Sequence, residues 1–411
     1  MFLDQIGFRE LSQSLEATIG GRVAPMIYMP KPGVGERSEV EAFDFSTAGG
    51  FTEANKKKME QEEKEMLSAN LLALTDPFLM NVHHRHSFLK LDPFRWLQAL
   101  IFPEGFPAHP HAGFNTLTYV LKGQMKHRDS MGVKQVYGNG AAQFLTAGNG
   151  VLHEEMWEFS KGRDMELFQI WINLPRRHKD IDPSLQLVGD TDNHDGKGPI
   201  PEITILSPSS SSSTSSSSVF SASPRGAEKK VTVRVLMGEA HGLQGKLESL
   251  TPMTVLHVSM DSGSSWAFPL PSHHTCHIYA RKGPLDVLVD AGGGRDGGKP
   301  GLVRVETHET AFMKTGGELL QVHSPLDGKG GSDFLVLAGE PLREPVAASG
   351  PWVFNEASEA TRAYARYQTG AFGLPWEHTL DDEAWRDVCR VGRRGGGGEG
   401  GGGGGGITRD L

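Results

Sequence analysis

Short runs rich in β-branched and aromatic residues, separated by glycine, proline and aspartate, fill the chain from about residue 71 onward. Such runs are typical of β-strands bounded by turns. The segments that predict strands most clearly are Thr116–Leu121, Gln143–Leu145, Leu167–Leu174, Val231–Met237, Met253–Met260, Leu285–Val289 and Phe334–Leu337. Many short strands at close spacing predict an all-β protein built from sandwiches or barrels.

The strand pattern stops between Pro175 and Val231, where no segment predicts a strand and Ser207–Ser218 is almost entirely serine. A segment of this composition cannot bury enough apolar surface to order itself. We therefore expect two β domains, each with its own core. The expected divisions are an N-terminal extension that is partly mobile (1–65), a first β domain (66–180), a serine-rich linker (181–230), a second β domain (231–345), a helical segment (346–390) and a disordered glycine-rich tail (391–411).

Two segments near the C-terminus have the composition of helices. Glu356–Tyr367 combines helix-forming residues with apolar or aromatic positions one turn apart, and Trp376–Arg390 repeats this pattern more weakly. We expect both to pack on the outside of a β domain. The glycine-rich stretches Gly292–Gly298 and Gly328–Gly331 predict long surface loops.

Composition narrows the functional classes. The 411 residues include 41 Lys and Arg against 50 Asp and Glu, and the formal net charge of -9 argues against direct binding of nucleic acid through a broad basic surface. No run approaches the roughly 20 apolar residues of a membrane helix. The two cysteines, Cys276 and Cys389, predict free thiols and suit a reducing compartment. The N-terminus resembles neither a secretory signal nor a transit peptide, so we expect a protein of the cytoplasm, the nucleus or both.

Histidines at alternate positions supply the candidate chemistry. Two such triplets occur, His84–His86 and His109–His111, and alternation along a strand would direct both rings of a triplet to one face. Spacing alone is weak in a chain with 17 histidines. The second triplet is more informative, because it precedes a strand and is followed downstream by His153 with Glu155 two residues later.

The sequence around these histidines resembles the pirin family of bicupins. The resemblance rests on the runs Phe106–Gly123 (FPAHPHAGFNTLTYVLKG), His127–Ser130 (HRDS) and Thr146–Met156 (TAGNGVLHEEM), and it continues through Gln169–Leu174, Val233–Glu239 and Phe334–Pro341. It implies two tandem cupin domains, which are jelly-roll β-barrels, with peripheral C-terminal helices and disordered inserts. It also implies one Fe²⁺ per chain in the N-terminal barrel, held by three His and one Glu; other divalent metals remain possible. Carried over to this chain, the ligands are His109, His111, His153 and Glu155.

Several neighbouring residues are expected to lie outside the ligand set. Glu154 alternates to the opposite face of its strand, where we expect solvent exposure, although a bulge could exchange it with Glu155. Asn115 occupies a position where many pirins carry Glu. The resemblance implies that this Glu is not a metal ligand, so the change to Asn affects only how the surroundings of the ligands tune the metal. His127 in the HRDS turn is expected to be structural, with Asp129 and Ser130 serving the turn.

Two other groups of histidines are not expected to bind metal. His83, His84 and His86 predict a polar loop near the mouth of the barrel, with a role in supporting the metal ligands as the less favoured alternative. The C-terminal barrel is expected to lack a metal, because the following group has no paired spacing and no downstream H-x-E: His273, His274, Cys276 and His277.

Two functions fit the resemblance, and they belong to different classes. Pirins resemble quercetin 2,3-dioxygenases, which implies an enzyme that opens a flavonol ring with O₂ and uses Glu155 as general base. The apolar wall for a planar substrate is expected from Phe106, Phe114, Phe144 and Met156. The alternative is a non-enzymatic, iron-dependent nuclear coregulator that binds a transcription factor. A scaffold that keeps its metal only for stability is the third and least favoured reading. A monomer is expected in each case.

Overall fold

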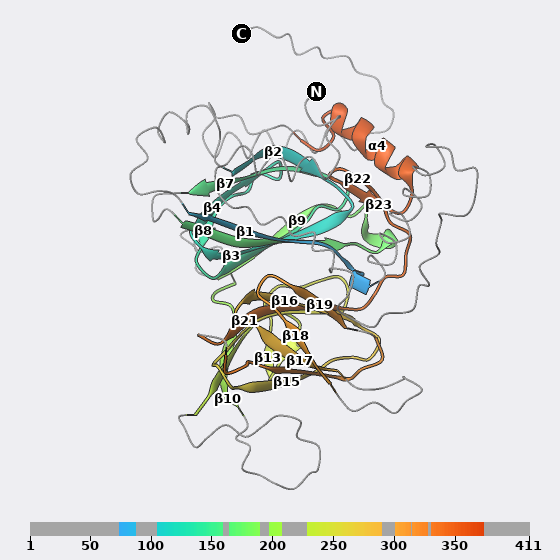
Figure 1. Cartoon of the computed structure of the whole chain (residues 1–411). Helices are drawn as coiled ribbons and strands as arrows, with labels where there is room; N and C mark the ends of the chain where they lie inside the picture. Colours follow the sequence, from blue (N-terminus) through green and yellow to red (C-terminus); the bar gives the residue numbers. More distant parts are fainter. Residues whose placement is uncertain are drawn as a thin grey trace, which may run out of the picture.

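The computed structural model consists of two stacked β-barrels with one helix against the first barrel (Figure 1). It describes residues 74–87, 105–158, 164–189, 197–207, 228–289, 301–313, 315–327 and 330–373. The predicted all-β class with two tandem barrels is confirmed. Four predicted segments lie outside the described residues: the N-terminal extension (1–65), the loop Gly292–Gly298, the second helix at Trp376–Arg390 and the glycine-rich tail.

Two antiparallel sheets form the N-terminal barrel. The first has the strand order β1-β8-β3-β6-β9 and the second β2-β7-β4-β5. The strands are β1 Phe78–Ser87, β2 Gly105–His111, β3 Phe114–Lys122, β4 Gln124–Asp129, β5 Lys134–Gly138, β6 Ala141–Thr146, β7 Val151–Glu158, β8 Asp164–Asn173 and β9 Ser184–Val188.

The C-terminal barrel also has two antiparallel sheets, with orders β10-β11-β14-β21-β16-β19 and β15-β20-β17-β18. Its strands are β10 Glu202–Leu206, β11 Lys230–Met237, β14 Met253–Met260, β15 Ser265–Pro269, β16 Thr275–Lys282, β17 Leu285–Val289, β18 Gly301–Val305, β19 Thr310–Met313, β20 Leu319–His323 and β21 Ser332–Gly339. The short pairs β12 Glu239–Ala240 with β13 Leu243–Gln244, and β22 Ala347–Ser349 with β23 Trp352–Phe354, complete the strands.

The first sheet of the N-terminal barrel is apolar on its outer face, whereas its inner face carries both polar and apolar side chains. Along β3, Leu117 and Tyr119 belong to a cluster of buried residues from both barrels, whereas Thr118 on the other face contacts polar side chains. Because the second barrel covers the outer face, hydrophobic burial there holds the barrels together. Inside the first barrel, polar side chains such as Thr118 lie beside a buried apolar cluster that includes Val120 and Leu167.

The interior of the C-terminal barrel is apolar instead. Its core includes Val258, Trp266, Ile278, Phe334 and Val336, each at most 3% exposed. Large apolar side chains that pack closely together leave few contacts for a polar ligand. The two barrels therefore share a fold but offer different interiors.

The expectation that no strand lies between Pro175 and Val231 is wrong. A short 3-10 helix (Arg176–His178) and the strands β9 and β10 lie in this stretch. Both strands pair with longer neighbours, β9 with β6 and β10 with β11. Pairing to a formed sheet compensates for their short length and mixed polarity.

The expected polar loop at His83, His84 and His86 is also wrong, because these residues lie in β1 and pair along β8. His83 is buried between the barrels, where Nε2 lies 3.0 Å from Glu166 Oε1 and Nδ1 lies 3.0 Å from the Tyr279 hydroxyl. The histidine thus belongs to a polar contact between β1 of one barrel and β16 of the other.

The predicted helix at Glu356–Tyr367 is confirmed as α4, Ala357–Gln368. Glu356 and Glu359 form a capping box that satisfies backbone N–H groups at its first turn. Ala360 and Ala363 face the second sheet of the N-terminal barrel, in a cluster with Leu152 of β7. No helix among the described residues is long and apolar enough to cross a membrane.

Candidate metal centre

Strand β7 lies between β2 and β4 and brings the candidate ligands together. His153 on β7 is paired with His109 on β2 and with Asp129 on β4. Glu155, two residues further along β7, is paired with His127 on β4. Directly paired residues of antiparallel strands point to the same face, so these side chains converge inside the barrel.

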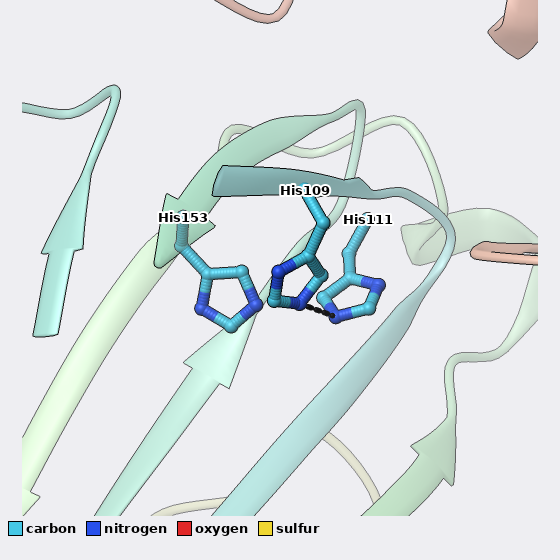
Figure 2. Close-up of side chains that lie close together, drawn as sticks. All are labelled: His109, His111 and His153. Atoms are coloured by element: carbon cyan, nitrogen blue, oxygen red, sulfur yellow. Dashed lines mark hydrogen bonds between the residues drawn. The ribbon is translucent and has the colours of Figure 1, made fainter. Parts of the chain in front are cut away.

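Three histidine rings form the outer part of this cluster (Figure 2). The ligand nitrogens of His109, His111 and His153 all lie within 4.8 Å of one another. Nε2 of His109 is 3.1 Å from Nε2 of His111, and the ring centroids of His109 and His153 are 4.4 Å apart. The H-x-H spacing therefore does what alternation along a strand predicts, and β7 adds the third ring.

Burial disfavours the charged form of these imidazoles. It lowers the pKa of His109, and it lowers the pKa of His111 and of His153 well below the usual value, with the neighbouring imidazoles adding to the effect at the last two. A lowered pKa favours the neutral imidazole, which has a lone pair available for a metal.

Unpartnered nitrogens test whether the cluster suits a metal. Both ring nitrogens of His153 are buried without a hydrogen-bond partner. Leaving such groups unpaired costs free energy, about 1–3 kcal/mol each, unless a ligand satisfies them. His109 instead donates from Nδ1 to the Pro107 carbonyl, 2.8 Å away, which leaves the lone pair on Nε2. The donor set is therefore one that a divalent metal would satisfy.

Glu155 lies deeper in the barrel than a simple strand reading indicates. It is 2% exposed, and its Oε1 accepts a hydrogen bond from Thr118 Oγ1 at 2.8 Å and from the Tyr137 hydroxyl at 3.4 Å. Glu154 points to the opposite face, as expected, but the expected solvent exposure is wrong: it is 8% exposed and forms an ion pair with Arg128 at 3.4 Å. The sequence did not predict Thr118 or Tyr137 at the site. Thr118 is two positions from Thr116 and therefore lies on the same face of β3.

A second group of possible ligands overlaps the first at His153. The ligand atoms of His127, His153 and Glu155 lie within 4.8 Å of one another, and all three residues are buried. The sequence predicted only a structural role for His127. Its strand register, opposite Glu155, brings it to the site.

Comparison with known proteins agrees with this geometry. A family model described as Pirin matches residues 57–172, and a second, described as the pirin C-terminal cupin domain, matches residues 255–373. The chain belongs to the pirin family.

Pirins from distant organisms align over most of their length. Human Pirin is 32% identical over 301 residues, which cover 71% of this chain and 86% of that protein. A Pseudomonas aeruginosa protein named "Putative quercetin 2,3-dioxygenase" is 30% identical over 291 residues, covering 70% of this chain and 87% of that one. The crystal structure of a quercetin 2,3-dioxygenase from Acinetobacter baumannii, 26% identical, superposes with a TM-score of 0.56 and covers 74% of this chain and 89% of its own.

The pirin resemblance predicted an apolar pocket, and the structure places only part of it beside the histidines. Phe114 is fully buried, with its ring 5.0 Å from that of His111 and 4.5 Å from that of Trp171. Trp171, whose ring lies 5.4 Å from His111, was missed. It shares a face of β8 with Gln169, so strand alternation could have identified it.

The other three pocket residues fit less well. The expectation for Phe144 is wrong, because it lies in the cluster between the two barrels. The expectation for Met156 is wrong as well, because this residue alternates with His153 and Glu155 along β7 and lies on the same face as Glu154. Phe106 is half-buried and contacts the ring of His84, with 5.5 Å between centroids.

Asn115 lies on the β3 face opposite Thr118 and is 2% exposed. It alternates with Thr116 and Thr118, so it faces away from the histidines.

Both groups of three or more candidate ligands found among the described residues lie in the N-terminal barrel. His277 of the C-terminal barrel is buried beside Phe78 of the N-terminal barrel, with 5.2 Å between their ring centroids.

Proposed function

We propose that this pirin is a metal-dependent dioxygenase of the quercetin 2,3-dioxygenase type, acting with O₂ on a flavonol-like substrate. The proposed ligands are His109, His111, His153 and Glu155, and the proposed metal is one Fe²⁺ per chain. The observation that carries the proposal is the cluster of His109, His111 and His153, the last two buried, together with the buried carboxylate of Glu155 within 4.8 Å of the His153 ligand atom. The Pseudomonas and Acinetobacter proteins, which are named for this activity, support the reaction class.

Iron bound in such a set would act as a Lewis acid toward the substrate oxygens and as the centre at which O₂ reacts. Four protein ligands leave up to two of six octahedral positions for exogenous molecules. Iron suits imidazole and carboxylate donors together, whereas a structural zinc site is more often closed and bears cysteine. Cys276, the cysteine among the described residues, lies in the core of the other barrel.

Glu155 would take the proton of the hydroxyl through which the flavonol binds. Its Oε1 accepts hydrogen bonds from Thr118 and Tyr137, so one carboxylate oxygen is held by the protein and the other remains for substrate or metal. Burial raises the pKa of Tyr137 well above its usual value, so the phenol stays protonated and acts as a donor. This pair fixes the orientation of the general base.

Apolar side chains at the outer end of the cluster would contact the flat rings of the substrate. Phe114 and Trp171 pack against each other and against His111, forming an aromatic wall beside the proposed ligands. Aromatic faces favour planar ligands and exclude water from the reacting oxygens.

The test is oxygen consumption by iron-loaded protein with a panel of flavonols. Wild type should consume O₂, and Glu155→Gln should lose at least about two orders of magnitude in turnover while keeping some metal, because the amide cannot accept the proton. Glu154→Gln is the matched control, since its side chain faces away, toward Arg128, and it should retain activity. Iron-loaded wild type that consumes no O₂ with any flavonol would contradict the dioxygenase proposal and favour a coregulator.

A further inference from the structure

His127 and Asp129 form a buried pair beside the proposed metal ligands. They are two residues apart on β4, and neither side chain is exposed to solvent. His127 Nε2 donates to Asp129 Oδ2 at 2.8 Å, while Asp129 Oδ1 accepts the backbone N–H groups of Met131 and Val133 at 2.8 and 3.1 Å. The carboxylate is thus fixed by the turn and in turn fixes the ring.

This hydrogen bond determines where the lone pair of His127 lies. A carboxylate oxygen can only accept, so in the neutral ring this hydrogen bond places the proton on Nε2 and the lone pair on Nδ1. Nδ1 is buried and has no hydrogen-bond partner. An imidazole whose second nitrogen is held by a carboxylate is the usual arrangement of a metal-ligating histidine.

The second donor group has its own chemical character. His127, His153 and Glu155 supply two imidazoles and one carboxylate, a set that leaves open positions and suits Fe²⁺. The first group, His109, His111 and His153, supplies imidazoles and no carboxylate. In a buried site a divalent cation is stabilised by a nearby anion, so the carboxylates of Glu155 and Asp129 favour the inner group electrostatically.

We propose that the N-terminal barrel offers one ion two overlapping positions: an outer one at His109 and His111, and an inner one at His127, with His153 and Glu155 common to both. His127 is then a metal ligand and Asp129 is the residue that positions it. Because His153 serves both, occupancy stays at about one ion per chain. The inference rests on the proposed metal centre and adds the inner position to it.

Titration of metal-free protein with Co²⁺ tests the inner position, with bound metal and the visible absorption spectrum as readouts. The double variant His109→Ala/His111→Ala removes the outer position and leaves the inner ligands in place. We expect it to bind about one Co²⁺ with a spectrum different from that of wild type. His153→Ala, which removes the shared ligand, should bind none. A double variant that binds no more Co²⁺ than His153→Ala would overturn the inner position.

Asp129→Asn then tests the role of His127 with little change of shape. The amide oxygen can still accept from Met131 and Val133, but the amide NH₂ donates to Nε2 and moves the ring proton to Nδ1, which removes the lone pair. In the double-variant background it should weaken Co²⁺ binding about 10- to 100-fold, and His127→Gln should do the same.

In the wild-type background Asp129→Asn should weaken Co²⁺ binding far less than it does in the double variant, because the outer ligands remain. An equal effect in both backgrounds would contradict two positions. No effect in the double variant would contradict ligation by His127. Thermal melting of each metal-free variant identifies any that has lost its fold, and His127→Gln and Asp129→Asn provide two independent routes to the same ligand. Wild type that binds no metal would instead contradict the proposed function itself.

Discussion

Replacing Arg281 with methionine should destabilise the protein by breaking the charged contact between the two barrels. Arg281 on β16 donates from Nη1 to Glu166 of β8 at 2.7 Å, and from Nε and Nη2 to Asp333 of β21 at 2.6 and 3.0 Å. The guanidinium is about one-tenth exposed. Methionine fills much of the same volume, so the change removes mainly the charge and its hydrogen bonds.

The expected loss of stability depends on the hydrogen bonds that Glu166 and Asp333 keep after the substitution. Each charge-assisted hydrogen bond contributes about 1.5–3 kcal/mol, but the three are not additive. Glu166 keeps His83 as a partner, and Asp333 keeps His257 and Ser259. Removing one partner from a buried ionic contact costs about 3–5 kcal/mol, and this is the loss of unfolding free energy that we expect at pH 7.5.

The destabilisation caused by Arg281→Met should be smaller at low pH. The hydrogen bonds from His83 and Arg281 lower the pKa of Glu166 from 4.5 to about 2 despite its burial. A carboxyl group with a depressed pKa stabilises the fold above the unfolded value and loses this contribution as pH falls toward the folded value. The wild type therefore loses this stabilisation between about pH 4.5 and 2, and the difference from Arg281→Met should be smaller at pH 3.5.

Urea denaturation followed by tryptophan fluorescence measures this difference at both pH values. Arg304→Met is the control, because Arg304 pairs with Asp286 inside one barrel and its side chain is 38% exposed. A pair of this exposure contributes about 1 kcal/mol or less. The reasoning is refuted if Arg281→Met costs no more than the control at pH 7.5, or if its cost grows as the pH is lowered.

Two further changes test other parts of the structure. Phe144→Ala should lower the free energy of unfolding by about 3–5 kcal/mol, since it opens a cavity in the cluster between the barrels, and metal analysis should find its metal content unchanged because the side chain is not at the histidines. Lys179 is buried, and its Nζ donates to the carbonyls of Gly113 and Val353 and to Asn173. Burial lowers the pKa of Lys179 from 10.5 to about 8. Between pH 8 and 10.5 the unfolded chain therefore binds more protons than the folded protein, and the stability of the wild type should rise with pH in this range. Thermal melting of Lys179→Met should show no such rise.

Much of the fold could be predicted from sequence because its signals are local, whereas the outer histidines were identified as ligands through the pirin resemblance. The run Thr116–Leu121 has a strand composition, and the H-x-H spacing of His109 and His111 fixes the common side of their rings. The helix at Glu356–Tyr367 has its own periodicity and its own cap. These features need no knowledge of distant parts of the chain.

The errors occur where distant residues determine the outcome. Strand β6 is buried on both faces, so its sequence does not tell which face is the barrel interior, and Phe144 was assigned to the wrong one. The histidines of β1 interrupt a strand pattern, and the partners of His83, Glu166 and Tyr279, are far along the chain. His127 and Asp129 have the spacing of one strand face, but only the pairing of β4 with β7 brings them to the candidate ligands His153 and Glu155.

Metal analysis of wild type and His153→Ala, purified without oxygen and loaded with Fe²⁺, tests the metal centre most directly. His153 belongs to both groups of candidate ligands, and both of its ring nitrogens lack hydrogen-bond partners. We predict about one iron per wild-type chain and almost none in His153→Ala, with both proteins folded by circular dichroism. Iron bound equally by the two proteins would contradict a metal centre at these residues.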